Sequence, residues 1–377
     1  MQLELSPDQE MLRDTTARFL DELVPPDEVR RLRDDPTGFD DRYWERGAEL
    51  GWTSLLVSED HGGGSISGVG LADLALISHE FGRHAAPGPL TAANVVAATL
   101  SEVGGASHVD VLGELLAGTA IATWAAAEPA PHDGLGEVAL EVRIEGDEVV
   151  LSGVKRPVES AGRASHLLVT GRTGDGLTQV LVPTGTAGVS MRPMRSVDLT
   201  RRFAVVTFDE VRVPIAAVVG EAGRAGAQVD RQLLRAVALT CAEDVGALQL
   251  AFDMTVEWAF DRYSFGRPLA SFQALKHRFA DMKAWLEASH AITDEAIEAV
   301  SAGAPDAARL ASAAKAFIGP YGAELMQECV QLHGGIGVTF EHDLHLYLRR
   351  HTVNQSLYGT PAQHRQRLTD LHEEEAA

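Results

Sequence analysis

The segment from Leu233 to Phe252, LLRAVALTCAEDVGALQLAF, is the feature that most limits the fold. Its only charged residues are Arg235, Glu243 and Asp244. An α-helix that is apolar on all sides has to be buried inside a larger helical layer. Two adjacent buried carboxylates cost free energy unless they are paired or neutralised. The segment therefore predicts a buried helix whose two acidic side chains need partners.

The spacing of hydrophobic residues along the chain divides it into three parts. Helical spacing runs through residues 1–119, whereas residues 120–225 alternate apolar and polar positions around short turns such as Gly174-Asp175-Gly176. Long helical segments with short breaks fill residues 226–377. These periods predict an α+β protein with an N-terminal α-helical domain, a middle β-barrel domain and a C-terminal four-helix bundle domain.

Charge and cysteine content exclude several classes of function. Lys and Arg number 32 against 54 Asp and Glu, a net charge of −22, which disfavours nucleic acid as a partner. Two cysteines, Cys241 and Cys329, suit a reducing cytoplasm better than a disulfide scaffold. We find no zinc-ligand spacing, no signal peptide and no membrane span, and so expect a metal-free cytoplasmic protein.

Three stretches resemble the acyl-CoA dehydrogenase family. They are RYSFGRPLASFQALKHRFADM at 262–282, QLHGGIGVTFEHDLHLYLRR at 331–350 and SVDLTRRFAVVTFDEVRVP at 196–214. The resemblance covers nearly the whole chain in order, and the chain is similar to actinobacterial members that form heteromeric complexes. It implies an FAD cofactor, an acyl-CoA substrate, an electron-transfer flavoprotein or similar acceptor, and a homo- or hetero-tetramer.

The resemblance also implies which residues contact FAD. An arginine can neutralise the pyrophosphate, glycines let backbone approach the ligand, and glutamine amides suit the adenosine part. In the family two neighbouring subunits supply these contacts. The matching positions are Arg262, Phe265, Gln273, Gln331, Gly334, Gly335 and Thr360.

The catalytic base is the uncertain part of the resemblance. Tyr358 stands where the family usually has a glutamate, and a neutral tyrosine is a poor base. Glu243 is our candidate base, with Gly246 beside it leaving room for a substrate. The alternatives are Asp244 as the base, or a chain without a base in which these carboxylates pair structurally with an arginine.

The β region departs from the family pattern as well. Glu128-Pro129 is present, but Ala127 replaces the hydroxyl residue that usually precedes it. Trp124 suits packing or a place beside the flavin, and Arg201 matches the family's β-domain arginine or forms an ion pair.

Two functions follow from the resemblance. One is FAD-dependent α,β-dehydrogenation of an acyl-CoA thioester; the other is a non-catalytic or FAD-completing partner subunit of a heteromeric acyl-CoA dehydrogenase. A weaker option is another flavin-dependent oxidation on the same fold.

Overall fold

The computed structural model describes residues 5–376, which begin with a helical part. The first helix starts with a capping box, in which the Ser6 side chain accepts from Gln9 N and the Gln9 side chain accepts from Ser6 N. The N-terminal helices are α1 (Pro7–Leu23), α2 (Pro26–Leu32), α3 (Asp41–Glu49), α4 (Gly70–Arg83), α5 (Leu90–Val103) and α6 (Val109–Leu116).

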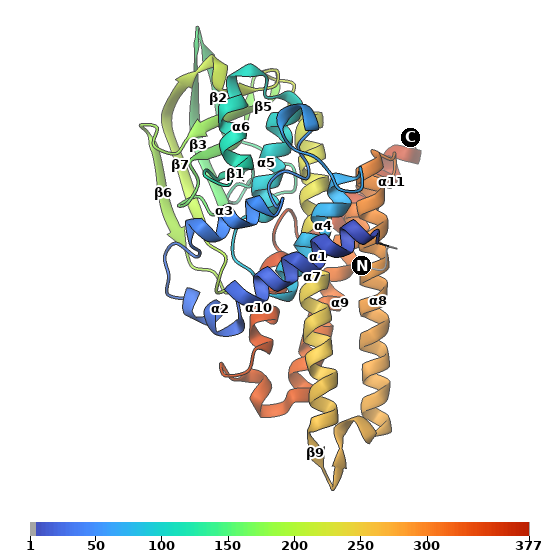
Figure 1. Cartoon of the computed structure of the whole chain (residues 1–377). Helices are drawn as coiled ribbons and strands as arrows, with labels where there is room; N and C mark the ends of the chain where they lie inside the picture. Colours follow the sequence, from blue (N-terminus) through green and yellow to red (C-terminus); the bar gives the residue numbers. More distant parts are fainter. Residues whose placement is uncertain (1–4, 377) are drawn as a thin grey trace.

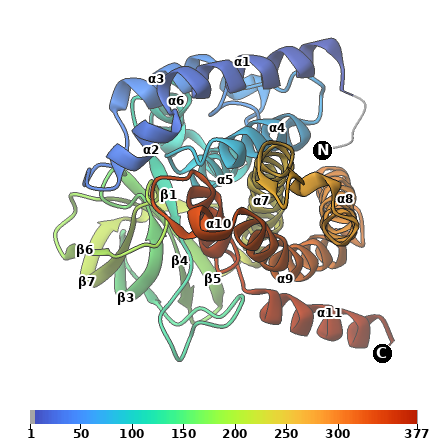
Figure 2. The same cartoon turned by 90° about the horizontal axis from the view of Figure 1, so that it is seen from below.

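An eight-stranded sheet follows, with β6 and β8 at its two edges. The hairpin expected at residues 174–176 is present, since Thr173 pairs with Gly176 across a two-residue turn. Its strands are β1 (Ala122–Ala125), β2 (Glu141–Glu145), β3 (Glu148–Glu159), β4 (His166–Thr173), β5 (Gly176–Pro183), β6 (Val189–Met194), β7 (Phe203–Pro214) and β8 (Val218–Val219). Helix α5 lies between this sheet and the C-terminal helices (Figures 1 and 2).

The C-terminal part is a bundle of long helices. Helices α7, α8 and α9 pack along one another, while α10 packs on α7 and α9, and α11 packs on α9 (Figure 2). A hairpin of β9 (Tyr263–Ser264) and β10 (Arg267–Pro268) joins α7 to α8 at the far end of the bundle (Figure 1). The bounds are α7 (Gly226–Asp261), α8 (Gln273–Ala302), α9 (Ala307–His333), α10 (Leu344–Asn354) and α11 (Pro361–Ala376).

This order of helices, sheet and helices confirms the predicted α+β architecture. The element type changes between α6 and β1 and again between β8 and α7. The division of the chain into domains at residues 119 and 225 stays a prediction. Within residues 5–376, no helix is both long enough and apolar enough to cross a membrane.

Helix α7 is buried as predicted, because α4, α5, α8, α9 and α10 pack on it, and α4 crosses it closely at two glycines. Every residue from Ala236 to Leu248 is buried. A Cβ on Gly246 would lie 2.0 Å from His79 O, and a Cβ on Gly82 would lie 1.8 Å from Glu243 O. The expectation that Gly246 leaves room for a substrate is therefore wrong, since the backbone of α4 occupies that space.

We expect Gly246→Ala to lower the free energy of unfolding by about 2–3 kcal/mol, because the added methyl group has to push two packed helices apart. Urea denaturation measures this change. Gly113→Ala is the matched control, since Gly113 is an exposed position inside α6 where a Cβ meets nothing within 4 Å. That control should gain about 0.5–1 kcal/mol from helix propensity. Equal effects of the two substitutions would contradict the close helix crossing.

Candidate functional site

A cavity of about 300 Å³ lies where the sheet meets α5, α7 and the loop after α10. We call it the central cavity. It contains five positions that the sequence motifs singled out: Trp124, Ala127, Glu128, Tyr358 and Thr360. It also contains Glu159, which the motifs did not single out. Segments far apart in the chain thus meet at one site.

Two aromatic side chains form part of the cavity wall. The rings of Trp124 and Tyr358 stack with centroids 6.1 Å apart and an interplanar angle of 17°. Trp124 Nε1 donates to Thr170 Oγ1 at 3.0 Å, which fixes the indole. Burial raises the pKa of the Tyr358 phenol, so this side chain stays neutral. The pair is a fixed wall, and Tyr358 does not supply a base.

Behind this wall lies a buried arginine–carboxylate network, formed by Glu159, Asp198, Arg201, Glu243 and Arg350. Glu243 accepts from Arg201 Nη2 at 2.5 Å and from Arg350 Nη1 at 2.6 Å. Arg350 Nε donates to Asp198 Oδ2 at 2.6 Å, and Arg201 Nε lies 3.5 Å from Glu159 Oε1. Glu159 comes from β3, Asp198 and Arg201 from the β6–β7 connection, Glu243 from α7 and Arg350 from α10.

The network also reaches the N-terminal helical part. Arg350 Nη2 donates to the backbone carbonyl of Ala86, at 3.0 Å, between α4 and α5. The same guanidinium donates to Thr200 Oγ1, which in turn donates to the carbonyl of Ala85. One buried side chain therefore connects all three parts of the chain.

The network holds three carboxylates against two guanidinium groups, and the imbalance falls on Glu159. Although burial opposes it, Arg350 holds the pKa of Asp198 down to about 2. Burial raises the pKa of Glu159, and the attraction of Arg201 offsets this only in part. Glu159 Oε1 accepts no hydrogen bond from the described residues.

The carboxylates of α7 have the partners that their burial requires, and they do not line the central cavity. Neither Glu243 nor Asp244 is among the residues that line the cavity. Asp244 has His351 Nδ1 at 3.0 Å from each of its oxygens. Both oxygens of Glu243 accept hydrogen bonds from guanidinium groups. This arrangement matches the alternative in which the carboxylates of this helix pair structurally with an arginine.

The predicted cofactor residues fall into two places. Thr360 lines the central cavity. The other six are exposed around the β9–β10 hairpin, the start of α8, the end of α9 and the following turn (Gly334–Val338), a region that we call the free end (Figure 1). These six are Arg262, Phe265, Gln273, Gln331, Gly334 and Gly335.

Backbone at the free end is open to an outside ligand. Gly334 has φ +67°, a conformation that favours glycine, and a Cβ on it would meet nothing within 4 Å. A Cβ on Gly335 would also meet nothing, so this chain does not fill the space beside either residue. Phe265, in the β9–β10 hairpin of the free end, is 96% exposed. The residues of the free end offer the open backbone and the cation that the phosphates of a dinucleotide require. They can contact such a ligand from one side only.

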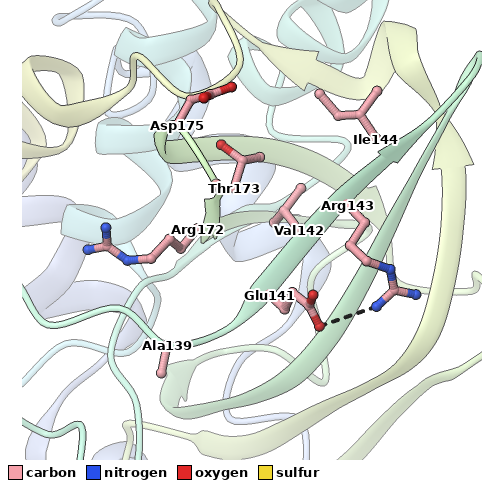
Figure 3. A pocket seen from close by; sticks show the side chains of 9 residues that line it. Ala139, Glu141, Val142, Arg143, Ile144, Arg172, Thr173 and Asp175 are labelled. Atoms are coloured by element: carbon pink, nitrogen blue, oxygen red, sulfur yellow. Dashed lines mark hydrogen bonds and ion pairs between the residues drawn. The ribbon is translucent and has the colours of Figure 1, made fainter.

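A second hollow, of about 480 Å³, lies on the outer surface of the sheet (Figure 3). Three of its four charged side chains, those of Glu141, Arg143 and Arg172, have partners within the described residues, and only Asp175 has none. Arg143 pairs with Glu141 at 3.2 Å and with Glu210 at 2.7 Å, while Arg172 Nε donates to Val138 O at 3.2 Å. The hollow therefore offers no convergent unpaired polar groups for a ligand.

Three members of the arginine–carboxylate network were missing from the site predicted from the sequence. Asp198 and Arg350 do lie inside the quoted motifs at 196–214 and 331–350, so their position there was an available signal. Glu159 lies outside these three motifs, and the fold of β3 places it in the cavity wall.

Family comparisons agree with this geometry. The acyl-CoA dehydrogenase N-terminal domain model matches residues 6–112, and the C-terminal domain model matches residues 225–370. The chain belongs to the acyl-CoA dehydrogenase family.

Similar proteins include two from actinobacteria. Acyl-CoA dehydrogenase IpdE2 of Mycolicibacterium smegmatis is 30% identical over 97% of this chain and 98% of its own length. IpdE2 of Mycobacterium tuberculosis is 30% identical over 96% of each chain. Among solved structures, a variant of the Tcur3481–Tcur3483 steroid ACAD matches with a TM-score of 0.88 and 28% identity, covering 98% of both chains.

We expect Arg350→Ala to lower the free energy of unfolding by about 3–5 kcal/mol, because it leaves two buried carboxylates without their main partner. Urea denaturation followed by circular dichroism measures the loss. Arg212→Ala is the control, since Arg212 pairs with Glu145 and Glu148 on the exposed face of the sheet. Such surface pairs contribute about 0–1 kcal/mol. Similar losses in both variants would show that the network does not hold the fold.

We expect Glu159→Gln to stabilise the protein more at pH 8 than at pH 5. A raised pKa means that the folded chain keeps a proton that the unfolded chain releases near the ordinary value of 4.5. The wild-type protein therefore loses folding free energy as the pH rises from about 4.5 to the raised pKa of Glu159. A neutral amide at this position avoids the loss. Melting temperatures across this pH range give the test. Parallel curves for wild type and variant would contradict a strained Glu159.

Proposed function

We propose that this chain is the FAD-completing subunit of a heteromeric acyl-CoA dehydrogenase, an enzyme that introduces an α,β double bond into an acyl-CoA thioester. The observation that carries the proposal is that the free end and the central cavity are separate and differ in character. The free end keeps an open, exposed set of cofactor residues, whereas the central cavity of the same chain departs from the family pattern. Bound FAD would supply the electron-accepting chemistry.

The free end suits FAD chemically. The guanidinium of Arg262 matches the dianionic pyrophosphate, and the open backbone at Gly334 allows close approach. A flavin lying only on this surface would keep its apolar ring in water, so a second chain has to cover it. Exposed Phe260, Tyr263 and Phe265 provide apolar surface at the same end for that contact.

The central cavity suits the flavin of this chain poorly. Its lining carries four acidic residues, Glu128, Asp133, Glu137 and Glu159, against Arg156 as its only arginine or lysine among the described residues. Lys155 and Arg201 pair with Glu128 and Glu159 from behind the wall, so Asp133 and Glu137 carry the remaining surplus of negative charge, which disfavours a dianionic cofactor. Ala127 also lacks the hydroxyl that the family pattern places there.

We further propose that Glu243 holds the network together rather than removing a substrate proton. Both of its oxygens accept hydrogen bonds from guanidinium groups, and it does not line the cavity. A base has to reach the proton that it removes. In this proposal the base belongs to the partner subunit.

The relatives support the same direction. The name of the Tcur3481–Tcur3483 steroid ACAD joins two proteins and the word steroid. We propose a bulky acyl-CoA as substrate, electron-transfer flavoprotein or a similar acceptor as oxidant, a hetero-tetramer as the assembly and the cytoplasm as its location.

A second candidate function is supported by Glu159. A carboxyl group with a raised pKa in a cavity is a common property of catalytic bases. In this alternative the chain binds FAD by itself and dehydrogenates an acyl-CoA in its own central cavity, with Glu159 or the sequence candidate Glu243 as the base.

The test is to purify this chain alone and together with a second dehydrogenase-like chain encoded beside it. We expect the chain alone to be colourless, and the complex to carry flavin that bleaches with an acyl-CoA thioester under anaerobic conditions. Arg262→Ala in this chain should leave the complex assembled but remove most of its flavin on gel filtration, because the pyrophosphate loses its cation. Flavin absorbance per complex is the measurement.

Arg309→Ala is the control, since Arg309 is an exposed arginine near the start of α9 that pairs with Asp306. It should leave the flavin content unchanged. Bleaching of a flavin bound to this chain alone would support the second candidate instead. Glu159→Gln and Glu243→Gln would then show which carboxylate removes the proton.

A further inference from the structure

The loop that carries the open glycine backbone of the free end is tied to the other end of the chain. It runs from Gly334 to Asp343, between α9 and α10, and we call it the glycine loop. Its first part is the turn that contains Gly334 and Gly335. Its last part lies against α2 (Pro26–Leu32), where Arg30 donates hydrogen bonds to it.

Arg30 makes three polar contacts with the last part of the glycine loop. Its Nε donates to the carbonyl of Phe340 at 3.2 Å, and its Nη2 donates to the carbonyl of Glu341 at 3.1 Å. Nη2 also pairs with the carboxylate of Asp343. The Arg30 side chain is 17% exposed, and hydrogen bonds from a charged donor are stronger than neutral ones. The guanidinium of Arg33 adds a contact 5.4 Å from the centre of the Phe340 ring.

The apolar side chains of the glycine loop bury little surface of their own. Val338 is 76% exposed, and Ile336 and Phe340 are about two-fifths exposed. The Phe340 ring stacks on His345 of α10, with centroids 4.5 Å apart, and the Phe340 carbonyl lies 3.2 Å from His345 Nε2. That contact is local, because α10 directly follows the loop. Arg30 adds a link to a separate part of the molecule.

Helix α2 is a firm support for this link, because its C-terminal end is also tied down. The guanidinium of Arg202 donates to the carbonyl of Leu32 and, at 2.8 Å, to the carbonyl of Asp35 just beyond the helix. Carbonyl groups at a helix end lack partners within the helix, so a cation there satisfies them. Arg202 directly follows Arg201 of the arginine–carboxylate network. Figure 1 shows α2 beside α10 and the loop that precedes it.

We propose that Arg30 is a positioning residue for the cofactor of the free end. The proposal rests on the proposed function, in which the free end contacts FAD. By holding the last part of the glycine loop against α2, Arg30 keeps the backbone of Gly334 and Gly335 in the arrangement that receives the phosphates. A loop that is held before its ligand arrives loses less conformational freedom on binding. Arg30 acts through the loop and needs no contact with the cofactor.

The test measures the loop and the cofactor separately. Hydrogen–deuterium exchange of the full chain alone should be faster at residues 336–346 in Arg30→Ala than in wild type, because bonds such as Thr339 N to Ile336 O open more often. FAD titration of the flavin-free complex should show about tenfold weaker binding in this variant, since the apparent dissociation constant rises as the binding arrangement becomes less populated.

Two further readouts separate positioning from a general loss of structure. Saturating FAD should restore the full flavin absorbance of the Arg30→Ala complex, because its site is less populated rather than destroyed. Arg30→Lys keeps the charge but not the planar fork, so its FAD affinity should lie between those of Arg30→Ala and wild type. Arg30→Lys also serves as the test variant if circular dichroism shows that Arg30→Ala is unfolded.

Arg31→Ala is the matched control, since Arg31 is the next residue of α2, is 66% exposed and pairs with Glu28 of the same helix. It should change neither the exchange of the loop nor the FAD affinity. If the wild-type complex binds FAD and a folded Arg30 variant binds it equally well, or if exchange of the loop is unchanged, the positioning role is overturned and the proposed function stands. A wild-type complex that binds no FAD overturns the proposed function and this inference with it.

Discussion

The buried pairing of Arg350 with Glu243 and Asp198 is the interaction on which the rest of the structure depends. Its guanidinium also donates to Ala86 O and Thr200 Oγ1, so four acceptors from three parts of the chain converge on one fully buried side chain. Removing Arg350 would leave two buried carboxylates without their main partner. The position of the sheet against the bundle, and hence the shape of the central cavity, follows from this convergence.

The helix crossing at Gly82 and Gly246 works together with that network. The crossing brings the backbone of α4 against the turn of α7 that carries Glu243. This close approach fixes the height of Glu243 within the bundle, where its side chain meets Arg201 and Arg350. Backbone packing and charge pairing thus position the same residue by independent means.

Periodicity was sufficient to predict the order of the elements. The apolar run at Leu233–Phe252 predicted a buried helix with paired carboxylates, and α7 has both properties. The direction of a side chain was harder to predict. Gly246 lies one helical turn from Glu243 and suggested an open groove, yet the space is filled by a segment more than 160 residues earlier in the chain. Glu159 gave no signal because its role depends on the non-local approach of Arg201.

The free end and the central cavity differ in exposure and in charge. At the free end, Arg262 and the open glycine backbone leave one side of a site without a cover. In the cavity, Tyr358 and Trp124 close part of the wall, and Glu159 adds an uncompensated carboxyl group. A chain that served its own flavin would gain from a neutral or cationic cavity. A chain that contributes only its free end to a neighbour's cofactor has no such constraint.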